Sequence, residues 1–343
     1  MDHHTQDHVG ILSEAFYLPP DKKLVADVFR DEDVPFGTLS KNVDFQRDIG
    51  IHDIHVTEEM PSVLALEACR RAMDQASVSA SEIDLVVDFT SIPEDYVGPT
   101  WSAAGLVQHE LGLDNAFATA VNTGGCASYH LALKSVMSLM LSDTGFETAL
   151  LFAGDRTPEF NKTYYPITVA SDGGSALVVR RNSPRARILG VETISIGRLH
   201  DVWYVPGLQS REPNEEPTEK LLHMYAKMDK FNEGVIPINF RMFGKVMDRL
   251  LKKLDLTHDD VDYYIYPTFS TWDQAYFMKK FGLTPDKVYT SALKHRAGCA
   301  LDLGAHFLGD DVGEGGFAQA GRAKDQHVVQ RLRALFCRLN KNL

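Results

Sequence analysis

The second half of this chain repeats the order of secondary-structure signals found in the first half. In each half, an amphipathic helix leads through an acidic loop into a short apolar strand: residues 62–76, 81–84 and 85–87 in the first half, and 240–254, 259–262 and 263–266 in the second. Asp262 follows Asp84 by 178 residues, and this spacing holds from the helix into the strand. We interpret the shared order as a duplicated unit.

The repeat continues beyond this strand. Each half then carries a second helix, a Gly-Leu pair that ends it, and another strand: 101–111, 112–113 and 117–121 in the first half, and 272–281, 282–283 and 288–292 in the second. Gly282 follows Gly112 by 170 residues, so the intervening loop is shorter in the second half. Two ordinary units that look alike by chance are the alternative, but the near-constant spacing favours duplication. The predicted halves are residues 1–183 and 184–343.

Short apolar strands alternate with helices along the chain, and further strands are expected at 148–153 and 175–179. This alternation predicts an α/β fold in layers, with largely buried sheets. Hydrophobic residues make up 44% of the chain and charged residues 24%, which is enough apolar material for an ordinary core. No GxGxxG turn follows a strand and no GxxxxGK[ST] loop is present, so nothing in the sequence supports a nucleotide cofactor.

The charge balance narrows the classes of partner. Among 343 residues, 35 are Lys or Arg and 47 are Asp or Glu, for a net charge of −12 at pH 7. Such an anionic chain is not expected to bind nucleic acid or an anionic membrane surface. The polar start MDHHTQDHVG lacks the apolar core of a signal peptide, and no apolar run is long enough to span a membrane. We therefore expect a cytoplasmic protein with reduced thiols and, because no two cysteines form a CxxC pair, no metal site.

Cys126 follows two glycines and stands at the start of a helix expected to run to Leu141. The positive end of the helix dipole and the unpaired N–H groups of the first turn stabilise a thiolate at such a position. The same N–H groups can bind the oxyanion that forms on a thioester carbonyl, and Gly125 lets a substrate approach the backbone closely. The alternative is that the cysteine is simply a small buried residue. We keep that interpretation for the other three cysteines, Cys69, Cys299 and Cys337.

In the second half, the turn that corresponds to the Cys126 turn reads Lys294-His295-Arg296. If the halves pack about a pseudo-twofold axis, corresponding turns can meet near the axis, which would bring His295 to Cys126. An imidazole with a pKa of about 6.5 is suited to deprotonating an acceptor near neutrality. A solvated turn residue is the alternative for His295. His130, one turn into the helix after Cys126, is expected to pack or hydrogen bond rather than to catalyse.

The segment TGGCASYHLALKSV, residues 123–136, resembles the nucleophile segment of the 3-oxoacyl-ACP synthase III (KAS III) group of the thiolase superfamily. Four further segments resemble that group in the same order: Gly50-Ile51 with the helix at 62–76, SEIDLVV at 81–87, SDGGSALVV at 171–179 and VDYYIYP at 261–267. The resemblance covers roughly residues 45–295. It implies a five-layered αβαβα fold of two halves related by a pseudo-twofold axis, usually a homodimer. It also implies that an acyl group moves from a CoA or acyl-carrier-protein thioester to Cys126, with no cofactor beyond that substrate.

Two positions depart from the condensing members of the group. Where those have Pro-His-Gln, this chain has Pro267-Thr268-Phe269, and Thr268 cannot act as an imidazole does in decarboxylation. Where they have an Asn, the turn that aligns best holds His295. This pattern resembles the KAS III-like acyltransferases of polyketide, antibiotic and related natural-product pathways, which pass the acyl group from Cys to a hydroxyl, amine or thiol with His as base. The resemblance thus assigns catalysis to Cys126 and His295, and substrate binding to Gly125 and Thr268.

Two other functions stay open. One is decarboxylative condensation of the KAS III type, which the replacement of the Pro-His-Gln imidazole weakens. The other is a non-catalytic partner subunit of an active homologue, which the tail supports. From about residue 297 to 343 the group's Gly-rich loop is not recognisable, and this segment is either divergent or the product of a reading-frame change. The Asp that would orient His295 is not assigned either; the candidates are Asp302, Asp310 and Asp311.

Carrier-protein docking places a further demand on the surface. Acyl-carrier proteins are acidic, so an acidic chain needs a local basic patch to bind one. Lys252-Lys253, Lys279-Lys280, and Lys294 with Arg296 are the candidate contributors. An ordinary solvated surface is the alternative for each.

Overall fold

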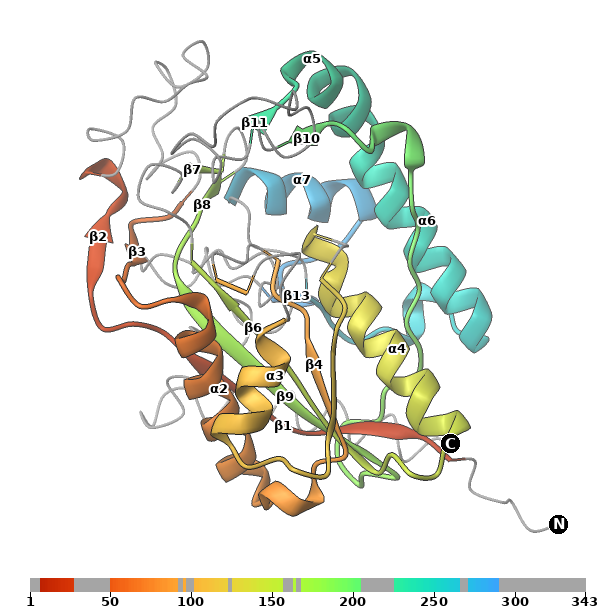
Figure 1. Cartoon of the computed structure of the whole chain (residues 1–343). Coiled ribbons are helices and arrows are strands. Elements are labelled where there is room, and N and C mark those ends of the chain that lie inside the picture. The colour runs from red at the N-terminus through yellow and green to blue at the C-terminus, as the bar shows by residue number, and fades with distance from the viewer. Residues whose placement is uncertain are drawn as a thin grey trace, which may run out of the picture.

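A computed structural model describes residues 7–27, 50–91, 95–96, 102–122, 125–156, 163–164, 168–204, 225–265 and 271–289. Their centre is a five-stranded mixed sheet in the order β1-β9-β6-β4-β5 (Figure 1). β4 pairs in parallel with β5 and β6, whereas β9 runs antiparallel to both β6 and β1. The strands are β1 (Val9–Tyr17), β4 (Leu85–Asp88), β5 (Phe117–Ala120), β6 (Thr148–Asp155) and β9 (Gly173–Arg181).

Helices cover both faces of this sheet. α2 (Pro61–Ala76) and α3 (Ala103–Glu110) pack on one face, and α4 (Ser128–Ser142) packs on the other (Figure 1). Strand residues divide between the two cores: Val86, Leu150 and Val178 pack with α2 and α3, and Leu85, Leu151 and Leu177 pack with α4. Because both faces are covered, β6 is buried along its whole length.

Two glycines allow α2 to lie directly on the sheet. Gly154 and Gly174 are paired across β6 and β9. A Cβ on Gly154 would stand 1.9 Å from the carbonyl oxygen of Pro61, and a Cβ on Gly174 would stand 2.1 Å from that of Leu64. No side chain fits at either position without moving backbone, so helix and sheet are in backbone contact near the carboxyl end of β6.

The second half contains the repeated unit. It consists of α6 (Ile236–Leu254), the 3-10 turn η9 (His258–Asp260), β12 (Tyr264–Ile265), α7 (Thr271–Phe281) and β13 (Val288–Tyr289). These correspond in order to α2, the 3-10 turn η3 (Ala80–Glu82), β4, α3 and β5. β12 and β13 pair in parallel with the register of the first copy, since Tyr264 faces Val288 as Val86 faces Ala118.

The turns of the two copies share their backbone geometry as well. Corresponding positions are the left-handed helix ends Ser77 (φ 53°) and Asp255 (φ 55°), the capping boxes that begin at Ser79 and Thr257, and the left-handed glycines Gly112 (φ 63°) and Gly282 (φ 65°). This agreement in caps, register and spacing supports the duplication that the sequence predicts. The boundary expected between residues 183 and 184 stays a prediction.

Short elements account for the rest of the described chain. They are the strand pairs β2 (Lys22–Leu24) with β3 (Asp53–His55), β7 (Thr163–Tyr164) with β8 (Thr168–Val169) and β10 (Trp203–Tyr204) with β11 (Tyr225–Ala226), and the helical turns η6 (Gly197–Leu199), α5 (Met228–Lys230) and η8 (Phe231–Val235), the last a π-helix. Among the helices of the described ranges, none is long and apolar enough to cross a membrane.

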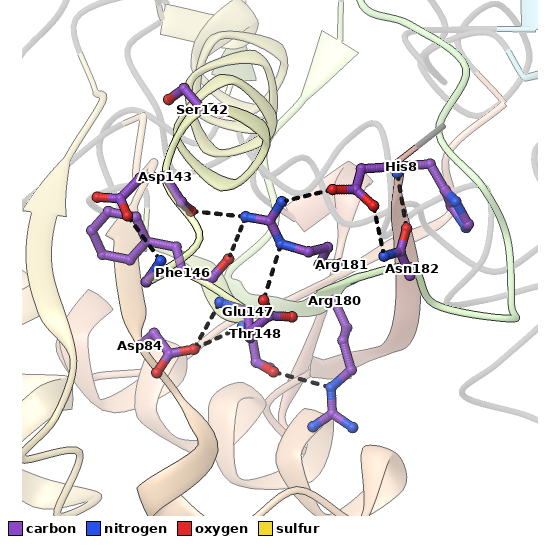
Figure 2. Close-up of polar contacts among 12 residues, drawn as sticks. His8, Asp84, Ser142, Asp143, Phe146, Glu147, Thr148, Arg180, Arg181 and Asn182 are labelled. Carbon is purple, nitrogen blue, oxygen red and sulfur yellow. Dashed lines mark hydrogen bonds and ion pairs between the residues drawn. The ribbon is translucent and has the colours of Figure 1, made fainter. Parts of the chain in front are cut away.

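Polar residues close the sheet at the amino ends of β4 and β6 (Figure 2). Asp84 accepts hydrogen bonds from the backbone N–H groups of Glu147 and Thr148, at 2.9 and 3.0 Å. The guanidinium of Arg181, at the end of the antiparallel strand β9, is buried beside them. It donates to the carbonyl oxygen of Asp143 at 2.8 Å and forms an ion pair with Glu147 at 3.1 Å. Backbone and side chains of three segments are thus tied together at this end.

Two strands differ from the sequence expectation. The first strongly periodic segment of the sequence is 62–76, so β1 is not predicted; a bulge between Ile11 and Ser13 interrupts its alternation. A buried strand is predicted at 117–121, but β5 lies at the edge of the sheet and Phe117 is 58% exposed. Periodicity alone does not report a strand's place in a sheet.

Candidate active site

The Cys126 turn lies beyond the carboxyl ends of the parallel strands. β4, β5 and β6 end at Asp88, Ala120 and Asp155, and in parallel strands these ends meet at one edge of the sheet. Five residues after β5, the chain forms the 3-10 turn η4 (Gly125–Ala127) and continues directly into α4. The edge at which open α/β sheets bind ligands therefore carries the turn expected to hold the nucleophile.

The backbone conformation around Cys126 differs in detail from the sequence prediction. The sequence predicts a helix that begins at Cys126, whereas the structure places Cys126 in η4, just before α4 begins at Ser128. Gly125 has φ 55°, a left-handed conformation that glycine adopts without strain. Ala127, the residue that caps α4, makes no side-chain hydrogen bond to the first helical turn. The N-cap residue of α4 therefore contributes no side-chain hydrogen bond to the first turn.

Other predicted site residues lie outside the described residues. These are Thr268 and His295, together with the whole segment from 290 to 343; of Cys126 only the backbone is described. The meeting of Cys126 with His295 and the binding role of Thr268 stay predictions. Within the described ranges, no group of three His, Cys, Asp or Glu side chains could hold a metal ion.

Thr90 follows β4 and joins it to β6. Its backbone N–H donates to Asp88 Oδ1 at 2.8 Å, and its hydroxyl oxygen accepts the N–H of Gly154 at 3.2 Å. Thr90 and Asp88 are both buried. The side chain of Asp88 also accepts the backbone N–H of Ala103, the first residue of α3. One carboxylate thus connects the end of a strand, the loop that follows it and the helix beyond.

Ser91, the next residue, joins β6 to the Cys126 turn. Its backbone N–H donates to Asp155 Oδ1 at 3.0 Å, and its hydroxyl donates to the carbonyl oxygen of Gly125 at 3.2 Å. Asp155 is the last residue of β6 and is 1% exposed. The loop after β4 therefore links the buried sheet edge to the residue immediately before Cys126.

Two buried carboxylates give this edge its electrostatic character. Burial is the largest cause that raises the pKa of Asp88 above its ordinary value, and the negative charge of Asp155 raises it further. Hydrogen bonds from the hydroxyl and N–H of Thr90 and from the N–H of Ala103 oppose these effects. Neutral donors rather than a basic side chain thus hold the carboxylate of Asp88.

His130 is packed into the start of α4. Its ring meets the ring of Tyr129 edge-on with centroids 5.1 Å apart, and Tyr129 in turn meets Phe89 at 5.5 Å. Burial lowers the pKa of His130 to about 4, so its imidazole is neutral at pH 7. The expectation that His130 packs or hydrogen bonds within the helix agrees with these contacts.

The sequence interpretation missed Asp88, Thr90, Ser91 and Asp155. Each follows or ends a run of apolar strand residues, LVV before Asp88 and LLFAG before Asp155. A polar residue at the carboxyl end of a buried parallel strand is the signal that would have selected them. The contact of Ser91 with Asp155 depends on the pairing of β4 with β6, which the sequence alone does not show.

The chain is similar in sequence to curated proteins that are named as synthases. It matches no family model. It is 29% identical over 294 residues to the beta-ketoacyl-[acyl-carrier-protein] synthase III of Caldanaerobacter subterraneus subsp. tengcongensis. The aligned region covers 83% of this chain and 84% of the relative. It is 27% identical over 243 residues to the enzyme of the same name from Clostridium perfringens, over 68% of this chain and 70% of the relative.

Solved structures share the fold. The 3-oxoacyl-[acyl-carrier-protein] synthase III of Aquifex aeolicus superposes with a TM-score of 0.68 at 17% identity, over 87% of this chain and 88% of that one. Xanthomonas campestris OleA, crystallised with lauric acid and lauroyl-CoA, superposes with a TM-score of 0.70 at 19% identity, over 92% of both chains. The thiolase-like α/β fold class is thereby confirmed. The sequence relatives and the fold agree: this chain is similar in sequence to KAS III proteins and shares the thiolase-like fold of the solved structures.

Proposed function

We propose that this protein is an acyltransferase of secondary metabolism. Cys126 takes an acyl group from a CoA or acyl-carrier-protein thioester and passes it to a hydroxyl, amine or thiol acceptor. The observation that carries the proposal is the placement of the Cys126 turn. It lies beyond the carboxyl ends of the parallel strands and directly before α4, at the positive end of that helix's dipole.

The first half-reaction would use this backbone directly. The thiolate of Cys126 attacks the thioester carbonyl and a new carbon–sulfur bond forms. The carbon–sulfur bond to the donor breaks, and the donor leaves as a thiolate that takes up a proton from solvent. Negative charge develops on the carbonyl oxygen during attack, and N–H groups at the start of a helix stabilise such a charge. The left-handed Gly125 leaves the acyl group room beside the backbone.

His295 would serve the second half-reaction. As a neutral imidazole it removes the proton of the acceptor, whose oxygen, nitrogen or sulfur then attacks the acyl-enzyme and releases Cys126. Thr268 occupies the position at which condensing members have an imidazole. A hydroxyl can bind substrate there but cannot replace that imidazole in decarboxylation, which favours simple transfer over condensation.

Condensation is the second candidate, because the relatives named above are synthases of the KAS III type. In that case a malonyl thioester would lose carbon dioxide, and its carbanion would attack the acyl-enzyme. Release of carbon dioxide from a malonyl thioester in the presence of the acylated protein would establish condensation, and its absence while acyl groups still reach other acceptors would exclude it.

A basic face supports an acidic carrier protein as donor. Exposed cations recur along one side of α6 at helical spacing: Arg241, Lys245, Arg249, Lys252 and Lys253. Asp248 adds one negative charge beside them. On a chain with a net charge of −12, such a concentration of positive charge is the surface suited to an acidic partner.

The edge of the main sheet supports the expected homodimer. β5 pairs with β4 on one side, and no second neighbour is found among the described strands. An edge strand exposes unpaired backbone groups, and the 58% exposed ring of Phe117 adds apolar surface to them. Pairing of β5 with its copy in a second chain would cover both.

Intact-mass measurement after incubation with a series of acyl-CoA donors and acyl-carrier proteins tests the proposal. We expect the wild type to gain the mass of the acyl group and Cys126→Ala to gain none. Cys69→Ala is the matched control, because burial raises the pKa of the Cys69 thiol and keeps it from donors; this variant should acylate normally. His295→Ala should retain the acyl group but transfer it poorly. No adduct with any donor would support the non-catalytic partner role instead.

A further inference from the structure

Ser91 makes hydrogen bonds to two different segments of the chain. Its N–H is bonded to the buried carboxylate of Asp155 at the end of β6, and its hydroxyl is bonded to the carbonyl oxygen of Gly125. The residue before it, Thr90, is itself fixed to Asp88 and Gly154. Ser91 therefore transmits the position of a rigid sheet edge to the turn that carries Cys126.

The geometry of the peptide unit gives this contact a chemical consequence. Gly125 O and Cys126 N–H belong to the same planar trans peptide, in which the C=O and N–H bonds point in opposite directions. A hydrogen bond that fixes the Gly125 carbonyl therefore also fixes the direction of the Cys126 N–H. Gly125 is in the left-handed region and has no side chain that would hinder rotation of this peptide. Without the Ser91 hydroxyl, the peptide has more freedom to turn.

We propose that Ser91 is a positioning residue, which orients the Cys126 N–H toward the oxygen of a bound acyl carbonyl. The inference rests on the proposed acyl transfer through Cys126. Ser91 touches neither the acyl group nor the sulfur in this account. Its contribution is to keep one N–H donor aligned before the negative charge forms, since alignment in advance is what makes such donors effective.

Three variants of Ser91 separate the effect of its hydroxyl from that of its side-chain volume. Ser91→Thr keeps the hydroxyl, and Ser91→Val has nearly the shape of threonine but no hydroxyl. Ser91→Ala removes the hydroxyl of serine with little change of volume. Ser135→Ala is the matched control, because Ser135 also donates its hydroxyl to a backbone carbonyl, that of Leu131 at 2.8 Å, but on an exposed part of α4.

The measurement is single-turnover acylation by an acyl-CoA that acylates the wild type, followed by intact mass at several donor concentrations. Ser91→Ala and Ser91→Val should lose about tenfold to a hundredfold in maximal rate, which is less than the full loss of an oxyanion donor. The donor concentration at half-maximal rate should change less than threefold, Ser91→Thr should stay within about threefold of wild type, and Ser135→Ala should be unchanged. Wild-type rates in Ser91→Val, or equal losses in Ser91→Thr and Ser91→Val, would overturn the inference.

Failure of the proposed function would be visible separately. If the wild type accepts no acyl group from any donor, that function is wrong, and alkylation by iodoacetamide then tests Ser91 without a donor. The N–H groups that bind an oxyanion also stabilise the Cys126 thiolate, so the midpoint of the pH dependence of alkylation should rise by roughly half a pH unit in Ser91→Val and stay near wild type in Ser91→Thr. Identical midpoints in the two variants would overturn the inference in that case.

Discussion

The two ends of the five-stranded sheet are stabilised in different ways. At the amino ends of β4 and β6, charges of opposite sign meet: Arg181 is paired with Glu147, and Asp84 binds backbone N–H groups (Figure 2). At the carboxyl ends, the buried carboxyl groups of Asp88 and Asp155 accept hydrogen bonds from the backbone N–H groups of Thr90 and Ser91. The first arrangement lowers the energy of the folded state, whereas the second buries two carboxyl groups at one edge of the sheet.

This difference indicates where the fold accepts a cost for function. The charge of Asp155 is one cause that raises the pKa of the buried Asp88, and shifted pKa values of buried carboxyl groups are common at functional sites. The carboxyl end is also the end that carries the Cys126 turn. The amino end, with its satisfied ion pairs, can hold the sheet together while the opposite edge remains specialised.

The largest expected effect concerns the backbone contact at the carboxyl end. Gly154→Ala would place a Cβ 1.9 Å from the carbonyl oxygen of Pro61, so α2 must move away from the sheet. We expect a loss of about 3 kcal/mol or more in the free energy of unfolding, measured by urea denaturation. Gly105→Ala is the control, because its added Cβ meets nothing within 4 Å on the exposed side of α3. That variant should gain up to about 1 kcal/mol, and similar results for both glycines would contradict the packing described here.

The second-largest effect is expected from a substitution at the amino ends of β4 and β6. Arg181→Met removes a guanidinium whose side chain is 6% exposed and leaves Glu147 and the carbonyl of Asp143 without this partner. We expect the free energy of unfolding to fall by about 1–3 kcal/mol, mainly because partly buried carbonyl acceptors lose their donor, while the acylation rate of the folded protein stays unchanged. Arg180→Met, which removes a more exposed guanidinium from Glu82, should cost much less. A slower acylation in Arg181→Met would show that the two ends are not independent.

More of the fold than of the candidate site could be predicted from the sequence. The duplication was accessible because helix period, acidic caps and Gly-Leu ends are local signals, and they recur at Ser79 and Thr257 and at Gly112 and Gly282. The Cys126 turn was accessible because two glycines precede a helix. Ser91 and Asp155 were not, because their contact forms only when β4 pairs with β6. β1 was missed because its bulge breaks the alternation on which strand prediction depends.

The smallest expected effect is on how the free energy of unfolding depends on pH, which should differ in sign between groups at the two ends of the sheet. Burial raises the pKa of Asp88, so the folded state holds its proton more tightly than the unfolded state does. Protonated Asp88 therefore stabilises the folded state at pH values below the ordinary Asp pKa of about 3.9. This stabilisation is lost as the pH rises through the higher pKa that Asp88 has in the folded state. Hydrogen bonds from the N–H and hydroxyl of Ser79 lower the pKa of Glu82, near the amino end of β4, so its stabilising effect is present above the ordinary Glu pKa of about 4.3 and is lost as pH falls.

Urea denaturation between about pH 3 and 7 measures these opposite slopes. Relative to Asp88→Asn, the wild type should lose stability as pH rises through this range, because only the wild type must ionise a buried carboxyl group. Relative to Glu82→Gln, the wild type should gain stability over the lower part of the same range. Slopes of the same sign for both pairs would show that Asp88 is not held in a charge-disfavouring environment, and the contrast between the two ends of the sheet would then rest on packing alone.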